Sequence, residues 1–329
     1  MKLFVLWIKW VAPIVCSALM AAVACAQGYP SKAVTLVSPF AAGGTSDVIA
    51  RATARLLEAE LGQSVVVVNR LGAGGTIGIA SIFNGPADGY QLVMGGLGSV
   101  VFTSAVYKGR LSYDPVKDLL PVGVVGSAPS VITVRASLNV KTLAELIALA
   151  KANPDKLSFG SAGVGGALHV AGVLLEKEAG ISLNHIPYKG GAPAINDLAA
   201  GVVDIALADL TLIKPVLQGD RVRPLAIATG ERSPMLPQVP TTAELGLPNV
   251  RMDTWYAVFA PAGTPAPVLA RLRSAMDKVR VNPELVNVLV GQGITPINQP
   301  LKAFEDQLRR DFEIWPGLLQ RICSQSSCL

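Results

Sequence analysis

The chain has 329 residues, of which 51% are hydrophobic, 16% charged and 5% aromatic, with a formal net charge of +5. This length and apolar share predict a sizeable core in one large or two ordinary domains, and exclude a disordered or fibrous chain. The aromatic share is too low for a platform that stacks single-stranded nucleic acid. Because the positive charge is small and scattered, we expect no nucleic-acid partner and no membrane-surface role.

The N-terminus has the layout of a secretory signal peptide. Lys2 and Lys9 precede the apolar run Val11–Val23, which leads to a small-residue cleavage site before Gln27. Cleavage there would leave 26 Lys and Arg against 23 Asp and Glu, a net charge of +3. The alternatives are a membrane anchor and a lipoprotein cleaved before Cys25. We expect a protein exported to the periplasm.

The cysteines and histidines do not predict a metal site. Cys323 and Cys328, on a polar C-terminal tail, could close a small disulfide loop in an oxidising compartment or remain two free thiols. The histidines, His169 and His185, lack the spacing of metal ligands. We therefore expect no metal and no cofactor.

Strand and helix patterns alternate through the first part of the chain. The strands are expected at Ala33–Ser38, Ser64–Val68 and Tyr90–Met94. The first leads into a helix that starts near Thr45 and ends at Gly62, and the second is followed by the glycine-rich Asn69–Thr76 and a short helix. This alternation with short links predicts a mostly parallel sheet and the α/β class.

The same alternation restarts at Val122. Further strands are expected at Val131–Val134, Leu157–Gly160, Val202–Leu207, Leu225–Thr229 and Trp255–Ala260. Further helices are expected at Leu143–Ala152, after Val164, before Gly201, at Pro267–Arg280 and at Leu301–Trp315.

Two segments, Val131–Ala152 and Trp255–Arg280, share the order strand, turn, helix. Two crossings of the chain between a pair of α/β lobes would produce this order. We therefore expect a signal peptide at 1–26, a first lobe from 27–124 plus 252–329, and a second lobe from 125–251. Ligands of such folds lie at the carboxyl ends of strands, here in the cleft between the lobes.

Three glycine-rich loops separate a strand from a helix start: Gly43–Ser46, Ser161–Gly166 and Gly190-Gly191. A helix N-terminus offers free N–H donors and a partial positive charge, and glycine lets a ligand approach the backbone closely. Asn69–Thr76 is a fourth such loop. Their convergence on one cleft would make a carboxylate or phosphate site that needs little arginine.

The patterns typical of enzymes are weak. The nucleotide-hydrolase phosphate loop and the nucleophile elbow are both missing from the sequence. His169 could act as a general base for Ser161, or have a structural or ligand-adjacent role. Asp204 and Asp209 follow a predicted strand, where an acid could accept from a ligand amine or hydroxyl, or make a capping or loop hydrogen bond.

Several blocks of the sequence together identify a family. They are, in order, Tyr29–Lys32, Pro39–Asp47, Asn69–Gly75, Pro86–Tyr90, Phe159–Gly165 with His169, His185–Ala194 with Asn196–Leu198, Pro240–Gly246 and Ala260–Pro265. These blocks resemble the substrate-binding proteins of tripartite tricarboxylate transporters, the Bordetella uptake gene (Bug) family. The resemblance covers nearly all of 28–316. It implies a monomeric periplasmic receptor without catalysis, whose two α/β lobes close like a Venus flytrap on a small carboxylate.

The resemblance also implies which residues contact the ligand. Two loops supply the first group: Phe40, Ala41, Gly43, Gly44, Thr45, Ser46, Asp47, Ser161, Ala162, Gly163, Val164, Gly165 and His169. Further candidates are Asn69, Gly74, Gly75, Lys189 and Asp204. Receptors of this kind pass their ligand to an inner-membrane permease or act through a sensor kinase.

Two other functions stay open at this point: a secreted hydrolase that uses Ser161 or Ser46, and a non-transport periplasmic protein with a degenerate pocket. The C-terminus also departs from the family pattern. Pro316-Gly317 follows Trp315, so we expect the last helix to be interrupted there.

Overall fold

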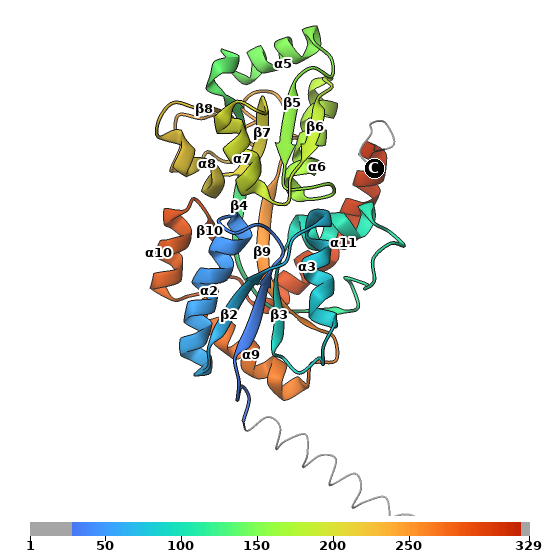
Figure 1. Ribbon diagram of the computed structural model, residues 1–329, viewed down its shortest axis with the longest axis vertical. Coiled ribbons are helices and arrows are strands. Elements are labelled where there is room, and N and C mark those ends of the chain that lie inside the picture. The colour runs from blue at the N-terminus through green and yellow to red at the C-terminus, as the bar shows by residue number, and fades with distance from the viewer. Residues whose placement is uncertain (1–27, 324–329) are drawn as a thin grey trace, which may run out of the picture.

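Figure 1 shows the computed structural model, which describes residues 28–323, with side chains described up to residue 320. The predicted signal peptide at 1–26 and the question of a Cys323–Cys328 disulfide therefore lie outside the described residues. The strands are β1 (Val34–Ser38), β2 (Val65–Asn69), β3 (Gln91–Gly96), β4 (Leu119–Arg135), β5 (Ser158–Ser161), β6 (Asn184–Pro187), β7 (Ile205–Asp209), β8 (Val222–Ile227), β9 (Asp253–Pro261) and β10 (Thr295–Pro296). The helices are α2 (Thr45–Leu61), α3 (Thr76–Ala80), α4 (Thr103–Val106), α5 (Leu143–Ala152), α6 (Ala167–Ala179), α7 (Gly191–Ala200), α8 (Leu210–Leu217), α9 (Ala266–Val279), α10 (Pro283–Gly291) and α11 (Leu301–Cys323).

The strands form two groups that share one long strand. β1 lies parallel between β2 and β3, and β5 lies parallel between β6 and β7. The first half of β4 pairs with β9 and β10, and its second half pairs with β7 and β8. We call the part around β1, β2 and β3 lobe 1, and the part around β5, β6, β7 and β8 lobe 2. They form the lower and upper halves of Figure 1, connected through β4 and β9.

The predicted fold class, α/β with two lobes, is confirmed, but the sheet is mixed rather than mostly parallel. β4 and β9 run antiparallel to each other, β9 also runs antiparallel to β3, and β4 also runs antiparallel to β7. The physical reason is topological: β4 carries the chain from one lobe into the other and β9 brings it back. Neither strand belongs to a βαβ unit, which is the arrangement that makes neighbours parallel.

The strand that pairs with β4 changes between Pro129 and Ser130. The Ser130 N–H donates to the Met252 carbonyl at 3.1 Å, and the Ala228 N–H donates to the Ser130 carbonyl at 2.8 Å. Along β4, Pro129 is paired with Asp253 of β9, whereas Ser130 is paired with β7. The lobe boundaries at 124/125 and 251/252 stay predictions.

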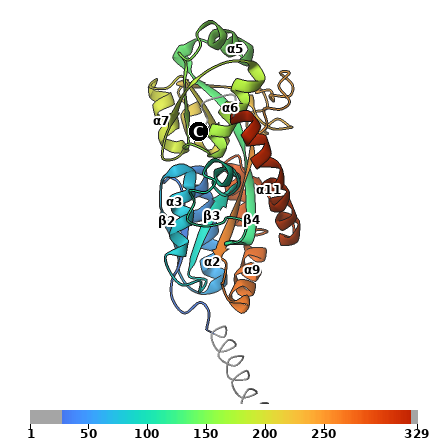
Figure 2. The same cartoon turned by 90° about the vertical axis from the view of Figure 1, so that its right-hand side faces the viewer.

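The last helix does not stop at Pro316. α11 continues to Cys323, which corrects the expected interruption. Phe304, Leu308 and Leu319 of this helix are buried in the main core, so burial extends beyond the proline and outweighs its cost of about 3 kcal/mol. Figure 2 shows α11 lying along both lobes, in agreement with its contacts to β4 and α6.

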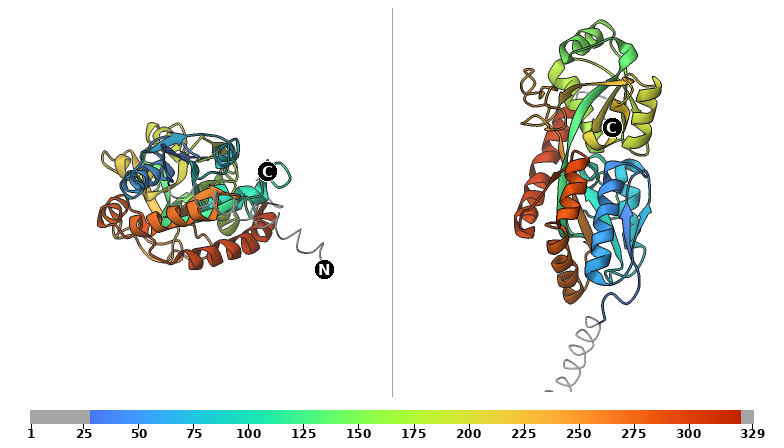
Figure 3. Two further views of the ribbon diagram at one scale, coloured as in Figure 1. Left: turned by 90° about the horizontal axis from the view of Figure 1, so that it is seen from below. Right: turned by 90° about the vertical axis from the view of Figure 1, so that its left-hand side faces the viewer.

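Other helices cover a different face of lobe 1 from the one that α11 contacts. α2, α9 and α10 lie side by side there (Figure 3), and their apolar faces form a second core with β1 and β9. The sequence did not predict α8 or α10, because both are short and α8 contains Pro215. None of the described helices is long and apolar enough to cross a membrane.

Candidate functional site

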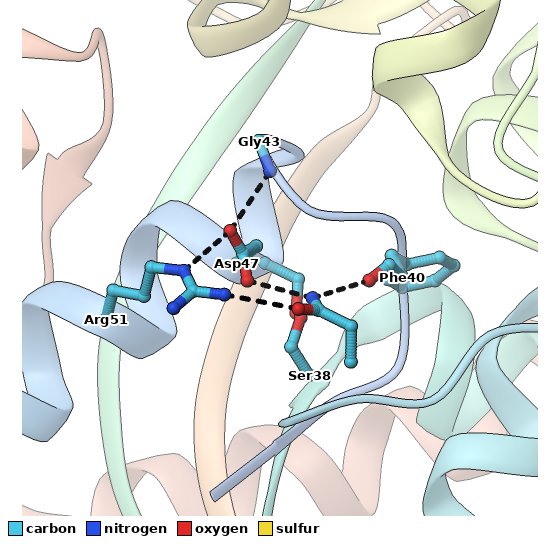
Figure 4. A network of polar contacts seen from close by, with 7 residues as sticks. Ser38, Phe40, Gly43, Asp47 and Arg51 are labelled. Atoms are coloured by element: carbon cyan, nitrogen blue, oxygen red, sulfur yellow. Dashed lines mark hydrogen bonds and ion pairs between the residues drawn. The ribbon is translucent and has the colours of Figure 1, made fainter. Parts of the chain in front are cut away.

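The loop between β1 and α2 is held by Asp47, the third residue of the helix. Its Oδ2 accepts a hydrogen bond from the Gly43 N–H at 3.0 Å and pairs with the Arg51 guanidinium at 3.0 Å. Its Oδ1 accepts from the Asn69 amide at 2.8 Å, and the same amide donates to the Phe40 carbonyl at 2.9 Å. Figure 4 shows this network at the start of α2. Asp47 thus braces the loop.

The charge of Asp47 is fixed by the same contacts. Burial alone would raise the pKa of Asp47, but the hydrogen bonds from Arg51, Gly43 and Asn69 outweigh it and lower the pKa below its usual value. Asp47 is therefore ionised at neutral pH. Since its oxygens are already occupied, we infer that Asp47 positions the loop.

The loop between β5 and α6 has the same geometry with a different side chain. His169 is the third residue of α6, and its Nδ1 accepts a hydrogen bond from the Gly165 N–H at 3.2 Å. Gly43 and Gly165 have φ values of 75° and 76°, in the left-handed region that favours glycine. The N-caps that follow, Gly44 and Gly166, have φ and ψ values of −75° and 163°, and −71° and 163°. The two loops are thus local copies of one turn.

Uncharged rings hold the second loop. The His169 and His185 rings stack with centroids 4.2 Å apart, and Phe159 stacks on His185 at 4.6 Å. Burial lowers the pKa of His169 to about 3, with the charge of His185 adding to the effect, and burial lowers the pKa of His185 to about 4. Both rings are neutral at neutral pH. The hydrogen bond from the Gly165 N–H requires that Nδ1 of His169 is unprotonated.

A cavity of about 40 Å³ lies between the lobes. On this measure one water needs about 10–15 Å³, so the space is larger than a single-water site. The starts of α2, α6, α7 and α8 contribute lining residues, and three of these helices have the glycine N-caps Gly44, Gly166 and Gly190. No side chain occupies those three helix ends as a cap. Free N–H donors and the helix dipoles therefore favour an anion in this cavity.

The two lobes are in direct contact around the cavity. A Cβ added to Gly74 of lobe 1 would lie 2.6 Å from the Val164 carbonyl oxygen of lobe 2. A Cβ added to Gly98 would lie 2.2 Å from the Ala167 nitrogen, and this approach again joins the two lobes. Only glycine permits such close approach of two backbones. The structure is thus a closed arrangement.

The structure brings some of the predicted site residues to the cavity. Those that line it are Phe40, Gly44, Thr45, Ser46 and Ala162. The cavity is also lined by residues that were not predicted from the sequence, among them Gly96, Gly98, Ser99, Thr254 and Tyr256. The glycines after β3 repeat the pattern of strand, glycine-rich turn and helical turn, which could have found them. Thr254 and Tyr256 lie on the crossing strand β9, where no local pattern marks them.

Other predicted residues lie around the cavity without lining it. Asn69 and Asp47 brace the first loop, while Ser161 and His169 are buried beneath the second. Gly74 and Gly163 approach each other where the lobes meet. Lys189 is exposed in the segment before α7. Their contact with a ligand stays a prediction.

Asp204 does not line the cavity. It precedes β7 rather than following a strand, and its Oδ1 pairs with the Arg135 guanidinium at 2.8 Å. Its Oδ2 accepts from the N–H and the hydroxyl of Ser158. These hydrogen bonds lower the pKa of Asp204 although burial acts in the opposite direction. Asp204 lies next to the amino end of β7. The β7 residue that lines the cavity is Asp209, at the opposite end of the strand.

The pairing of Ser161 with His169 that a general-base role would require is not formed. The Ser161 hydroxyl instead contacts His185 Nε2 at 2.7 Å and accepts from the Gly163 N–H at 3.2 Å. Ser161 is fully buried and does not line the cavity. Within the described chain, neither histidine pairs with a carboxylate that could orient it as a base. The geometry gives no support to a serine hydrolase at this position.

A larger hollow, of about 650 Å³, lies beside the crossing strands. Arg232, Arg251 and Asp253 are among its lining residues. It is lined by the segment 229–235 together with residues of β4, β9, α10 and β10, and its lining does not include the glycine-capped helix ends. The smaller cavity is therefore the candidate site. Across the described residues, no cluster of three His, Cys, Asp or Glu side chains could hold a metal.

Comparisons with known proteins agree with this architecture. The model of the tripartite tricarboxylate transporter family receptor matches residues 49–315. A protein encoded in the tcbD–tcbE intergenic region of Pseudomonas sp. strain P51 is 38% identical, over 89% of this chain and 87% of its own length. Protein BugT of Bordetella pertussis is 34% identical over 92% of both chains.

Solved structures agree as well. MatC from Rhodopseudomonas palustris with bound malate superposes with a TM-score of 0.84 at 29% identity, over 88% of this chain and 100% of that one. An R. palustris protein with adipate gives a TM-score of 0.85 at 33% identity, over 89% and 98% of the two chains. The periplasmic binding protein BugD gives 0.84 at 32%, with coverage of 89% and 98%. The chain belongs to the tripartite tricarboxylate transporter receptor family, whose members are periplasmic substrate-binding receptors.

Proposed function

We propose that this protein captures a small carboxylate in the cavity between its lobes and delivers it to a tripartite tricarboxylate-type permease. The observation that carries the proposal is the convergence of three glycine-capped helix N-termini, those of α2, α6 and α7, on one cavity between the lobes. Backbone N–H groups at such ends bind carboxylates without a paired lysine or arginine.

Two further facts support this proposal. The family is one of receptors, and two structures similar to this chain are described with malate and with adipate. We propose that the loops at 40–47 and 161–165 hold the ligand carboxylate, with one loop from each lobe. A ligand that bridges both loops stabilises the closed arrangement, because only that arrangement offers both sets of donors.

The test is a ligand screen by thermal unfolding on residues 27–329. The panel contains short, long and aromatic mono- and dicarboxylates, with the matching amides as uncharged controls. We expect a saturable rise in melting temperature with at least one carboxylate and none with its amide. Mass spectrometry then checks that the ligand is recovered intact, since a consumed ligand would indicate an enzyme.

No stabilisation by any carboxylate would contradict the proposal, provided that mass spectrometry of the denatured protein finds no ligand already bound. The permease is tested separately, by uptake of the labelled ligand in cells with and without the gene. Loss of uptake on deletion supports delivery to a permease. Unchanged uptake with intact binding would favour a sensor kinase as the partner.

A further inference from the structure

Asp209 lies at the edge of the cavity, where β7 ends and α8 begins. It is 2% exposed and yet lines the cavity. Its position is the N-cap of α8, but its side chain accepts no hydrogen bond from that helix, whereas an N-cap aspartate ordinarily does. Its Oδ2 instead accepts from the Tyr256 hydroxyl of β9 at 2.8 Å.

Among the described residues, the second carboxylate oxygen of Asp209 has no hydrogen-bond partner. The buried hydroxyls of Thr45, Ser130 and Thr254 likewise have none within this part of the chain. Thr45 and Thr254 line the same cavity, and Ser130 is paired with Asp209 across β4 and β7. Buried polar atoms nearly always have partners. Because Thr45, Thr254 and Asp209 line one cavity, a ligand bound there would lie within reach of all three.

The charge of Asp209 is also uncompensated. Burial raises the pKa of Asp209 to about 6 and Asp253 adds to the rise, while the hydrogen bond from the Tyr256 hydroxyl acts in the opposite direction. At neutral pH the carboxylate is therefore mostly ionised. The described residues that line the cavity include no lysine or arginine. A hydrogen-bond donor on the ligand would supply what this oxygen lacks.

We propose that Asp209 determines specificity by accepting a hydrogen bond from an ammonium or hydroxyl group of the ligand. This inference rests on the proposed function, because it takes the cavity as the carboxylate site. The glycine-capped ends of α2, α6 and α7 favour the ligand carboxylate, and Asp209 at the start of α8 favours a donor group of the ligand. The preferred ligand is thus a small hydroxy- or amino-carboxylate, and an unsubstituted acid leaves Asp209 unpaired.

The test uses two matched series of ligands with purified residues 27–329: propionate, lactate and alanine, and succinate, malate and aspartate. Calorimetry gives Kd for each. Within a series that binds, we expect the hydroxy or amino acid to bind at least about tenfold more tightly than the unsubstituted acid, as a hydrogen bond to a charged group implies. This comparison needs no variant.

Asp209→Asn then removes the charge at nearly constant size. We expect the preference to fall to within about threefold, with an unliganded melting temperature no lower than that of the wild type, because a buried unpaired charge is lost. The matched control is Asp204→Asn at the other end of β7, which should keep the preference even if it lowers stability.

Three results would overturn the inference: binding of the unsubstituted acid as tight as that of its partners, an unchanged preference in folded Asp209→Asn, or binding confined to longer or aromatic carboxylates without a donor. Each of them leaves the proposed function standing. Absence of binding across the whole carboxylate panel would instead overturn the proposed function, and this inference with it.

Discussion

The loops that begin α2 and α6 have the same backbone geometry but opposite chemistry. In both, a glycine N–H donates to the side chain four residues later, the third residue of the helix. In lobe 1 the acceptor is the ionised carboxylate of Asp47, supported by Arg51 and Asn69. In lobe 2 it is the neutral ring of His169, supported by its stack on His185.

The difference shows that a glycine-capped helix end can be built with or without a charge beside it. A carboxylate keeps lone pairs for the loop until the pH is low. An imidazole loses its acceptor as soon as Nδ1 is protonated. The two loops therefore respond to acid over different ranges of pH, although both face the same cavity.

The largest expected effect is the loss of stability in acid through His169. Its folded pKa, about 3, lies below the unfolded value of 6.5, so its contribution is complete above about pH 6.5 and falls as the pH drops toward 3. We expect about 3 kcal/mol to be lost between pH 7 and pH 4, or on the order of 5 °C in melting temperature. Because the pKa of Asp47 is lowered, its contribution to the free energy of unfolding is kept until the pH falls below about 4.

The control for this effect is His169→Asn, whose Oδ1 replaces Nδ1 as the acceptor and does not titrate. The difference between variant and wild type isolates His169 from other groups. Asp209 is one of these, because its raised pKa makes acid stabilising between about pH 4 and 6. Identical pH profiles for the two proteins would refute the assignment to His169.

A smaller effect is expected from the lobe 1 loop. Asp47→Asn places an amide donor among the donors of Gly43, Asn69 and Arg51, so we expect about 2 kcal/mol less free energy of unfolding in urea. Arg51→Met is the matched control. Because the Arg51 side chain is 54% exposed, its loss should cost less than about 1 kcal/mol. Equal losses would show that the ion pair, rather than the loop contacts, carries the stability.

The smallest expected effect concerns the contact between the lobes. Gly74→Ala places a methyl group 2.6 Å from the Val164 carbonyl oxygen in the closed arrangement, so we expect Kd for a carboxylate to rise about tenfold. The control is Gly62→Ala, which has a similar positive φ but no atom within 4 Å of the added Cβ. If both variants weaken binding equally, the effect comes from backbone strain and not from closure.

Local patterns accounted for much of the fold. The start of α2 after Gly44 and the end of α7 at Gly201 were predictable because caps act over a few residues. Even the shared turn has a readable signal, two glycines followed three residues later by Asp47 or His169. The run of α11 through Pro316 was not readable, since burial of Leu319 against the core overrides the local cost of a proline.

The sequence by itself determined the family, the α/β class and the glycine-capped helix ends that favour an anion, because each depends on residues close together in the chain. Only the tertiary structure decided which side chains form hydrogen bonds with one another. Ser161 meets His185 rather than His169, and Asp204 and Asp209, five positions apart, have opposite surroundings. The pairing of β5 with β6 brings His185 close to Ser161, and the crossing strand β9 brings Tyr256 and Thr254 to the cavity beside Asp209. Contacts at such separations depend on how the lobes pack, which no local pattern encodes.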